Sequence, residues 1–242
     1  MIQEIILIFS ILVLAFMYAA VGHGGASGYL AAMAMVGISP LVMKPSALLL
    51  NLGVSLLSFY HYARNGHFKF HLFWPFSLTS IPMAYLGAQW QITDSLYKKI
   101  LGIALLIALI RLVYKFPEAK ENKTIPVHWG LVVGGIIGLF SGMIGIGGGI
   151  ILSPVILLFR WAKMKEAAAI SALFIFVNSL SGILGLGNLS MIDMQELSYW
   201  LGAAVIGGFL GARWGAFLAI PERIKQVLAL VLLLASIKLF II

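Results

Sequence analysis

The chain has 242 residues, of which 62% are hydrophobic and only 10% are charged, and its mean hydropathy is +1.05. A soluble domain carries about 25% charged residues, so this composition excludes a water-soluble globular protein and indicates an all-α integral membrane protein. The net charge of +8 is dispersed along the chain without a basic patch, which argues against nucleic acid as a partner. The chain has no cysteine and therefore no disulfide or thiolate chemistry.

Glycine, proline and charged residues divide the chain into ten apolar segments. The segments are 5–21, 27–38, 46–63, 72–90 and 100–114, followed by 129–144, 150–161, 167–186, 197–218 and 227–242. We expect each to be helical because an isolated strand cannot span lipid, which gives about 8–10 hydrophobic helical segments. The N-terminus lacks the positive region of a cleavable signal peptide, so we expect none.

Two glycine runs interrupt these apolar segments. The first contains Gly22, His23, Gly24 and Gly25, and the second contains Gly145, Gly147, Gly148 and Gly149. Glycine breaks helices. The segments that follow, 27–38 and 150–161, have about 12 residues each, or about 18 Å of helix, against a hydrocarbon core of about 30 Å. We therefore predict two broken or re-entrant helix pairs, which in transporters mark the binding site.

The two halves of the chain repeat one another. Val21–Gly25 matches Ile144–Gly148, and Gly87–Trp90 matches Gly211–Trp214. Asn51 falls opposite Asn178, and all the offsets lie between 123 and 127 residues. We predict a first half at 1–114, a second half at 127–242 and a polar cytoplasmic linker at 115–126.

The distribution of Lys and Arg predicts the orientation. An odd number of crossings per half places twelve of the sixteen Lys and Arg on one face. The other face receives only Lys44, Lys98, Lys99 and Lys238. The richer face should be cytoplasmic, which puts both termini outside. The odd number of crossings also inverts the second half, which gives an inverted-topology repeat.

The glycine loops are the candidate binding site. Their backbone N–H groups can turn toward one point, and the short helices that begin near Ser27 and Ile150 add positive dipole ends. Two such ends facing one pocket would bind an anion. The alternative interpretation is that these glycines only allow close helix packing.

Three side chains near these loops are further candidate ligands. Asn51 and Asn178 lie within apolar segments, where they would contact the substrate or form interhelical hydrogen bonds. Ser27 has a hydroxyl just after the first loop, and Ser46 and Ser171 are weaker candidates of the same kind. His23 would bind the anion, carry a proton or pack as a hydrogen-bonded residue.

Charged side chains give weaker indications. Lys44 and Arg213 would gate or steer an anion, or would simply anchor helix ends at the interface. No predicted span contains Asp or Glu, which disfavours a cation as substrate and favours a small anion. The cluster of His61, His67 and His71 has no carboxylate or cysteine beside it, so we predict no metal site, and nothing indicates a cofactor.

These features resemble the TauE/SafE family of sulfite and organosulfonate exporters. The resemblance rests on the paired glycine runs, Pro154, the segment 171–182 and Gly211-Ala212-Arg213, and it covers nearly the whole chain. It implies a multi-pass exporter of sulfite, sulfoacetate or a related organosulfonate in the inner membrane, with the glycine loops and both Asn residues along the substrate path. His23 and Ala26 depart from a plain Gly-x-Gly-Gly-Gly motif, which leaves the particular anion open.

Two other functions remain open at this stage. Gly25-Ala26-Ser27-Gly28 is similar to the Gly-x-Ser-Gly of rhomboid proteases, but a serine nucleophile needs a base, and the later His residues lie at segment ends, with His61 near the end of the third segment and His128 just before the sixth. The other alternative is a scaffold subunit that transports nothing and whose polar residues only hold helices together. We favour a secondary transporter in contact with membrane lipid that moves an anion by alternating access.

Overall fold

The computed structural model describes residues 2–20, 22–113, 124–217 and 222–241, and they form helices without a strand. The helices of the first half are α1 (Ile2–Ala20), α2 (Ala26–Val36), α3 (Pro40–Arg64), α4 (Phe70–Gln89) and α5 (Asp94–Val113). Those of the second half are α6 (Val127–Ile144), α7 (Gly149–Leu158), α8 (Met164–Leu186), α9 (Met194–Phe217) and α10 (Glu222–Ile241). The expectation of an all-helical fold is confirmed.

The surface of the bundle is suited to lipid. Four helices, α1, α3, α6 and α8, are long and apolar enough to cross a membrane. Large apolar side chains point outward, as on α1, where Phe9 is 67% exposed. Exposed apolar side chains over whole helices would be unfavourable in water but match hydrocarbon. The chain is therefore an integral membrane protein with several spans.

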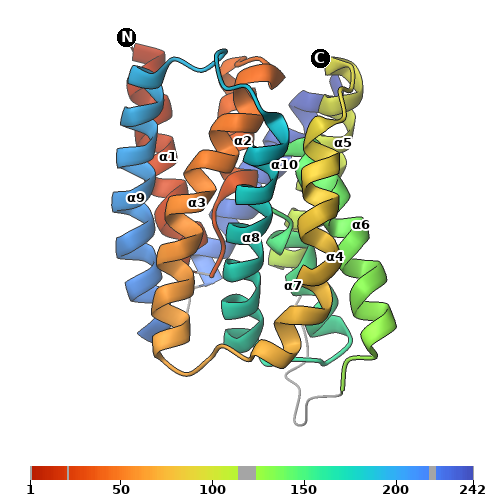
Figure 1. Cartoon of the computed structure of the whole chain (residues 1–242). Coiled ribbons are helices and arrows are strands. Elements are labelled where there is room, and N and C mark those ends of the chain that lie inside the picture. Colours follow the sequence, from red (N-terminus) through yellow and green to blue (C-terminus); the bar gives the residue numbers. More distant parts are fainter. Residues whose placement is uncertain (1, 21, 114–123, 218–221, 242) are drawn as a thin grey trace.

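The ends of the chain lie at the same end of the bundle, at the top of Figure 1. The hairpin of α1 and α2 starts and returns there, whereas the hairpin of α6 and α7 starts and returns at the opposite end (Figure 1). The helix α3 runs away from the end that holds the termini, and α8 runs toward it (Figure 1). Matched helices of the two halves thus run in opposite directions.

Glycines spaced four apart bring the helices of opposite halves together. On α6, Gly134, Gly138 and Gly142 lie against the backbone of α4 so closely that a Cβ at any of them would overlap it. On α9, Gly207, Gly211 and Gly215 lie in the same way against the backbone of α1. These α4–α6 and α1–α9 contacts are the most extensive in the bundle, and small residues at such spacing permit close backbone approach in membranes.

The helix boundaries differ most from expectation at the starts of α3, α5 and α10, which begin at Pro40, Asp94 and Glu222 instead of residues 46, 100 and 227. The helix α3 begins at Pro40 instead of residue 46, because a proline in the first turn gives up no helical hydrogen bond. The helix α8 begins at Met164 instead of 167, where Glu166 accepts from the N–H of Lys163. The short helices are Ala26–Val36 and Gly149–Leu158, close to the predicted 27–38 and 150–161. Most of the predicted linker, 115–123, lies outside the described residues.

Candidate functional site

The first glycine loop joins α1 to α2 inside the bundle. The N–H of His23 donates to the carbonyl of Tyr18, so the chain turns back at the end of α1. Gly25 caps α2 with φ of +93°, a left-handed conformation that favours glycine. Residues 22–34 are almost entirely buried. The helix α2 therefore begins deep in the protein, and its N-cap residue, Gly25, has no side chain to cap it.

The second glycine loop repeats this arrangement from the other end of the bundle. Gly145 ends α6, and Gly148 caps α7 with φ of +78°. A Cβ at Gly148 would lie 2.8 Å from Ile137 and 2.9 Å from Phe174, so the position has neither the conformation nor the space for a side chain. Both short helices thus begin at glycines that larger residues could not replace without strain.

Asn51 connects the two loops. Its Oδ1 accepts from the N–H of Ala26, at the start of α2, over 3.1 Å. Its Nδ2 donates to the carbonyl of Ile146, in the second loop, over 3.2 Å, and to Ser179 on α8 over 3.4 Å. The side chain is fully buried. A single carboxamide from α3 therefore holds the two breaks together.

Unpaired backbone donors remain at the start of both short helices. Among the described residues, the N–H groups of Ser27 and Gly28 on α2 and of Gly149 and Ile150 on α7 have no acceptor. Such first-turn groups, together with the helix dipole, favour negative charge. At the first N–H of α2, that of Ala26, the acceptor is the Oδ1 atom of Asn51.

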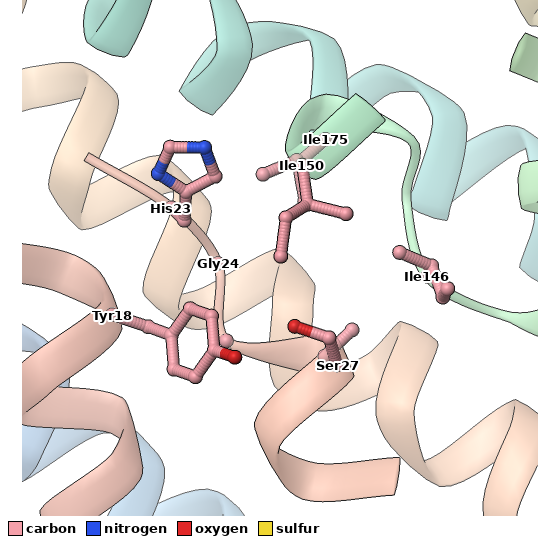
Figure 2. A pocket seen from close by; sticks show the side chains of 9 residues that line it. Tyr18, His23, Gly24, Ser27, Ile146, Ile150 and Ile175 are labelled. Carbon is pink, nitrogen blue, oxygen red and sulfur yellow. The ribbon is translucent and has the colours of Figure 1, made fainter. Parts of the chain in front are cut away.

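A small cavity lies between the loops (Figure 2). Its lining comes from both halves of the chain: Tyr18, His23, Gly24, Gly25, Ala26, Ser27, Ile146, Ile150 and Ile175. Its volume of about 10 Å³ is room for about one water molecule. An oxyanion with several oxygens needs more room, so this conformation is closed around the site.

Ile175 on α8 fills the space between the loops. Its Cγ2 would lie 2.9 Å from a Cβ at Gly24 and 2.8 Å from a Cβ at Gly147. Sequence reasoning did not select this residue, because an isoleucine in an apolar helix carries no polar signal. Displacement of its side chain is the simplest way to enlarge the cavity.

A buried hydrogen-bonded chain extends from His23 into the second half. The Nε2 of His23 lies 3.0 Å from the hydroxyl of Ser153 on α7. That hydroxyl lies 2.7 Å from the hydroxyl of Ser171 on α8 and 3.0 Å from the carbonyl of Gly149. Sequence reasoning gave Ser171 low weight and missed Ser153, whose only signal is a hydroxyl next to Pro154 in an apolar helix.

The other predicted site residues differ in how close they lie to the cavity and in their contacts. Asn178 on α8 is fully buried, but neither its Oδ1 nor its Nδ2 has a hydrogen-bond partner among the described residues. Gly22 packs against Ala168. Lys44 donates to the carbonyl of Ala88, and its backbone lies against Gly145, so it holds helices together close to the second loop. Arg213 is exposed on α9 and does not line the cavity.

A second, larger cavity of about 250 Å³ opens at the end of the bundle that holds the termini. It is lined by residues of α2, α3, α5 and α10, among them Asp94, Lys98 and Lys238. Tyr97 also lines it, and its hydroxyl donates to the carbonyl of Ile144 over 3.0 Å, just before the second loop. Tyr97 therefore connects the wall of this cavity to the end of α6, next to the second glycine loop.

None of the described residues forms a group of three or more His, Asp or Glu that could hold a metal ion. His61 and His67 instead contact aromatic rings: His61 packs against Phe209, and His67 against Tyr62. The pKa of His67, in the loop after α3, is lowered by burial and then by the positive charge of Lys165.

A multi-pass helical bundle with two glycine-broken hairpins is the architecture of a membrane transporter. The family described as sulfite exporter TauE/SafE matches residues 7–239. The chain is also 34% identical over 232 residues to the probable membrane transporter protein y4hK of Sinorhizobium fredii, with 94% of each chain covered. No solved structure matches it. The chain belongs to the TauE/SafE family, a family of membrane transporters.

The membership decides between the functions that the sequence left open. A TauE/SafE protein is a transporter and not an enzyme, so the protease interpretation of Ser27 is withdrawn. The Nε2 of His23, the imidazole nearest to Ser27 in sequence, lies 3.0 Å from the hydroxyl of Ser153.

Proposed function

We propose that this protein is a secondary transporter that exports a small anion, such as sulfite, sulfoacetate or a related organosulfonate, across the inner membrane. The single observation that carries the proposal is the pair of unsatisfied helix N-termini, from α2 and α7, on either side of one buried cavity. Backbone N–H groups and two dipole ends attract a negative charge without a Lys or Arg in the lining.

We also propose that the chain is an inverted repeat, with halves at 1–114 and 127–242 joined by a linker at 115–126. The opposite directions of matched helices support this proposal (Figure 1). So do the reciprocal contacts, since the fourth helix of each half packs against the first helix of the other. A pseudo-twofold relation of this kind allows the protein to open to either side by the same movement.

The closed cavity supports alternating access. Asn51, Ile175 and the two loops exclude all but about one water molecule. Substrate enters only if the loops separate, and separation would break the bonds of Asn51 to Ala26 and Ile146. The side chain of Asn51 thus holds the site closed, and the anion takes its place, since an anion oxygen can accept from the same N–H of Ala26.

The proposed orientation in the membrane follows from the distribution of Lys and Arg. The end with the termini is proposed to face the periplasm, because few Lys and Arg lie there. Its cavity, with Lys98 and Lys238, would be the outer mouth of the pathway. Lys44 and Arg213 are retained as candidates for steering anions from the two sides.

Flux in proteoliposomes tests the proposal. Purified protein is reconstituted into vesicles loaded with radioactive sulfite or isethionate, and the efflux is compared with that from protein-free vesicles. We expect saturable efflux, which the variant Gly24→Val should lack because its Cβ would lie 2.6 Å from Oδ1 of Asn51. The absence of efflux for every anion tested, with correctly folded protein, would refute the proposal and favour the scaffold interpretation.

A further inference from the structure

His23 brings a titratable group to a cavity that is otherwise lined by backbone and by uncharged side chains. His23 is 1% exposed, and in Figure 2 its ring lies near Gly24 and is turned away from Tyr18. The matched position in the second half is Ile146, so the imidazole occurs in one half only. The proposed anion site therefore has a built-in asymmetry that the repeat itself does not require.

The hydrogen-bonded chain beyond His23 accommodates both protonation states of the ring. When Nε2 is unprotonated, the hydroxyl of Ser153 donates to it. When Nε2 carries a proton, it donates to Ser153, which can turn its own proton toward the carbonyl of Gly149. Ser171 can donate to Ser153 in either case. The ring can thus gain and lose a proton without leaving this hydrogen bond unmade.

The residues that line the cavity together with His23 include no Lys, Arg, Asp or Glu. The titratable groups on the helices packed around it are Glu4 and Tyr18 on α1, Tyr29 on α2, Lys44, Tyr60, His61, Tyr62 and Arg64 on α3, and Lys165 and Glu166 on α8, with none on α7. None of the charged ones lines the cavity. Because a nearby opposite charge favours the charged form of a titratable group, an anion in the cavity stabilises the protonated ring.

We propose that His23 binds a proton when the anion binds and releases it when the anion leaves, so that the protein carries one proton with each anion. The proton comes from water on the loading side, binds at Nε2 and returns to water on the other side, and no bond of the anion changes. Because coupling between two ligands is reciprocal, the anion raises the proton affinity of the ring as much as the proton raises the affinity for the anion. This inference rests on the proposed function.

The experiment measures protons and anions together. Proteoliposomes contain a fluorescent pH indicator and receive an outward gradient of isethionate, whose sulfonic acid is fully ionised and cannot carry protons through lipid itself. For the wild type we expect one proton to leave with each isethionate, and a rate that does not change when valinomycin and potassium set the membrane potential, because the pair is neutral.

His23→Gln replaces the imidazole with an amide that can hydrogen-bond to Ser153 but cannot titrate. We expect isethionate efflux without proton efflux, and a rate that now depends on the membrane potential. The matched control is His61→Gln, a histidine on α3 that packs against Phe209 outside the cavity and should leave the proton-to-anion ratio unchanged. Ser153→Ala should keep coupling but shift its pH dependence, because it removes the partner of Nε2.

The outcomes separate the two proposals. Wild-type efflux of isethionate without protons would overturn the role of His23 and leave the anion transporter intact. Efflux of protons at the wild-type ratio from His23→Gln vesicles would do the same. A wild type that moves no anion would overturn both. If His23→Gln does not fold, the wild-type ratio and its independence of membrane potential decide alone.

Discussion

Asn51 and Asn178 stand at matched positions of the two halves, yet only Asn51 is hydrogen-bonded. Asn51 joins the first loop to the second through Ala26 and Ile146, whereas both polar atoms of Asn178 are buried without a partner among the described residues. An unsatisfied buried amide is unfavourable, so a state in which Asn178 finds partners should exist. Under the proposed alternating access, this difference is the asymmetry of one closed state, and the two asparagines would exchange roles in the other.

Substitution of the two asparagines should have opposite effects on stability. Asn51→Leu removes the hydrogen bonds of the Asn51 side chain to the N–H of Ala26 and the carbonyl of Ile146. Each buried group left unpaired should lower the free energy of unfolding by about 1–3 kcal/mol. Asn178→Leu removes an amide that has no partner and should leave the melting temperature unchanged or raise it. Thermal unfolding in detergent compares the two, and equal destabilisation would contradict the assignment. Both variants should transport more slowly.

The glycines of the loops should not tolerate side chains. Gly148→Val forces a β-branched residue into φ of +78° and against Ile137 and Phe174, so we expect anion efflux to fall to the background of protein-free vesicles. Gly202→Val on α9 is the matched control, because its Cβ would meet nothing within 4 Å. Comparable losses of efflux in the two variants would mean that the loop geometry has no special role.

Lys98 and Lys238, which line the cavity at the end of the bundle that holds the termini, should raise the local concentration of anions. Lys98→Gln combined with Lys238→Gln should reduce efflux or uptake at low anion concentration by several-fold and weaken its dependence on salt, since exposed charges act through a screened field. Lys99→Gln, next in sequence but outside the cavity, is the control. Unchanged transport in the double variant would remove this cavity from the pathway.

The orientation can be tested directly because the chain has no cysteine. Lys99→Cys, near the start of α5, should react with a membrane-impermeant maleimide in intact cells. Asn65→Cys, after α3 at the opposite end of the bundle, should react only after the membrane is permeabilised. The reverse pattern would place both termini in the cytoplasm.

Much of the architecture was accessible from the sequence because glycine breaks and hydrophobic length depend on local residues. The short helices at Ala26–Val36 and Gly149–Leu158 follow from the two glycine runs. What the sequence did not indicate depends on contacts between distant segments. Ser153 reaches His23 across 130 positions of the chain, and Ile175 meets both loops only because α8 passes between them. Neither residue is distinguishable from an ordinary packing residue by type or spacing.

The central claim is that an anion binds between the two glycine loops, and anomalous scattering tests it most directly. Selenite, the selenium analogue of sulfite, is co-crystallised with the protein, and data are collected at the selenium edge on protein that contains ordinary methionine. We predict one strong anomalous peak within hydrogen-bond distance of the first-turn N–H groups of α2 and α7, with Ile175 displaced. Selenium bound elsewhere in the bundle, with the space between the loops still closed, would contradict the account.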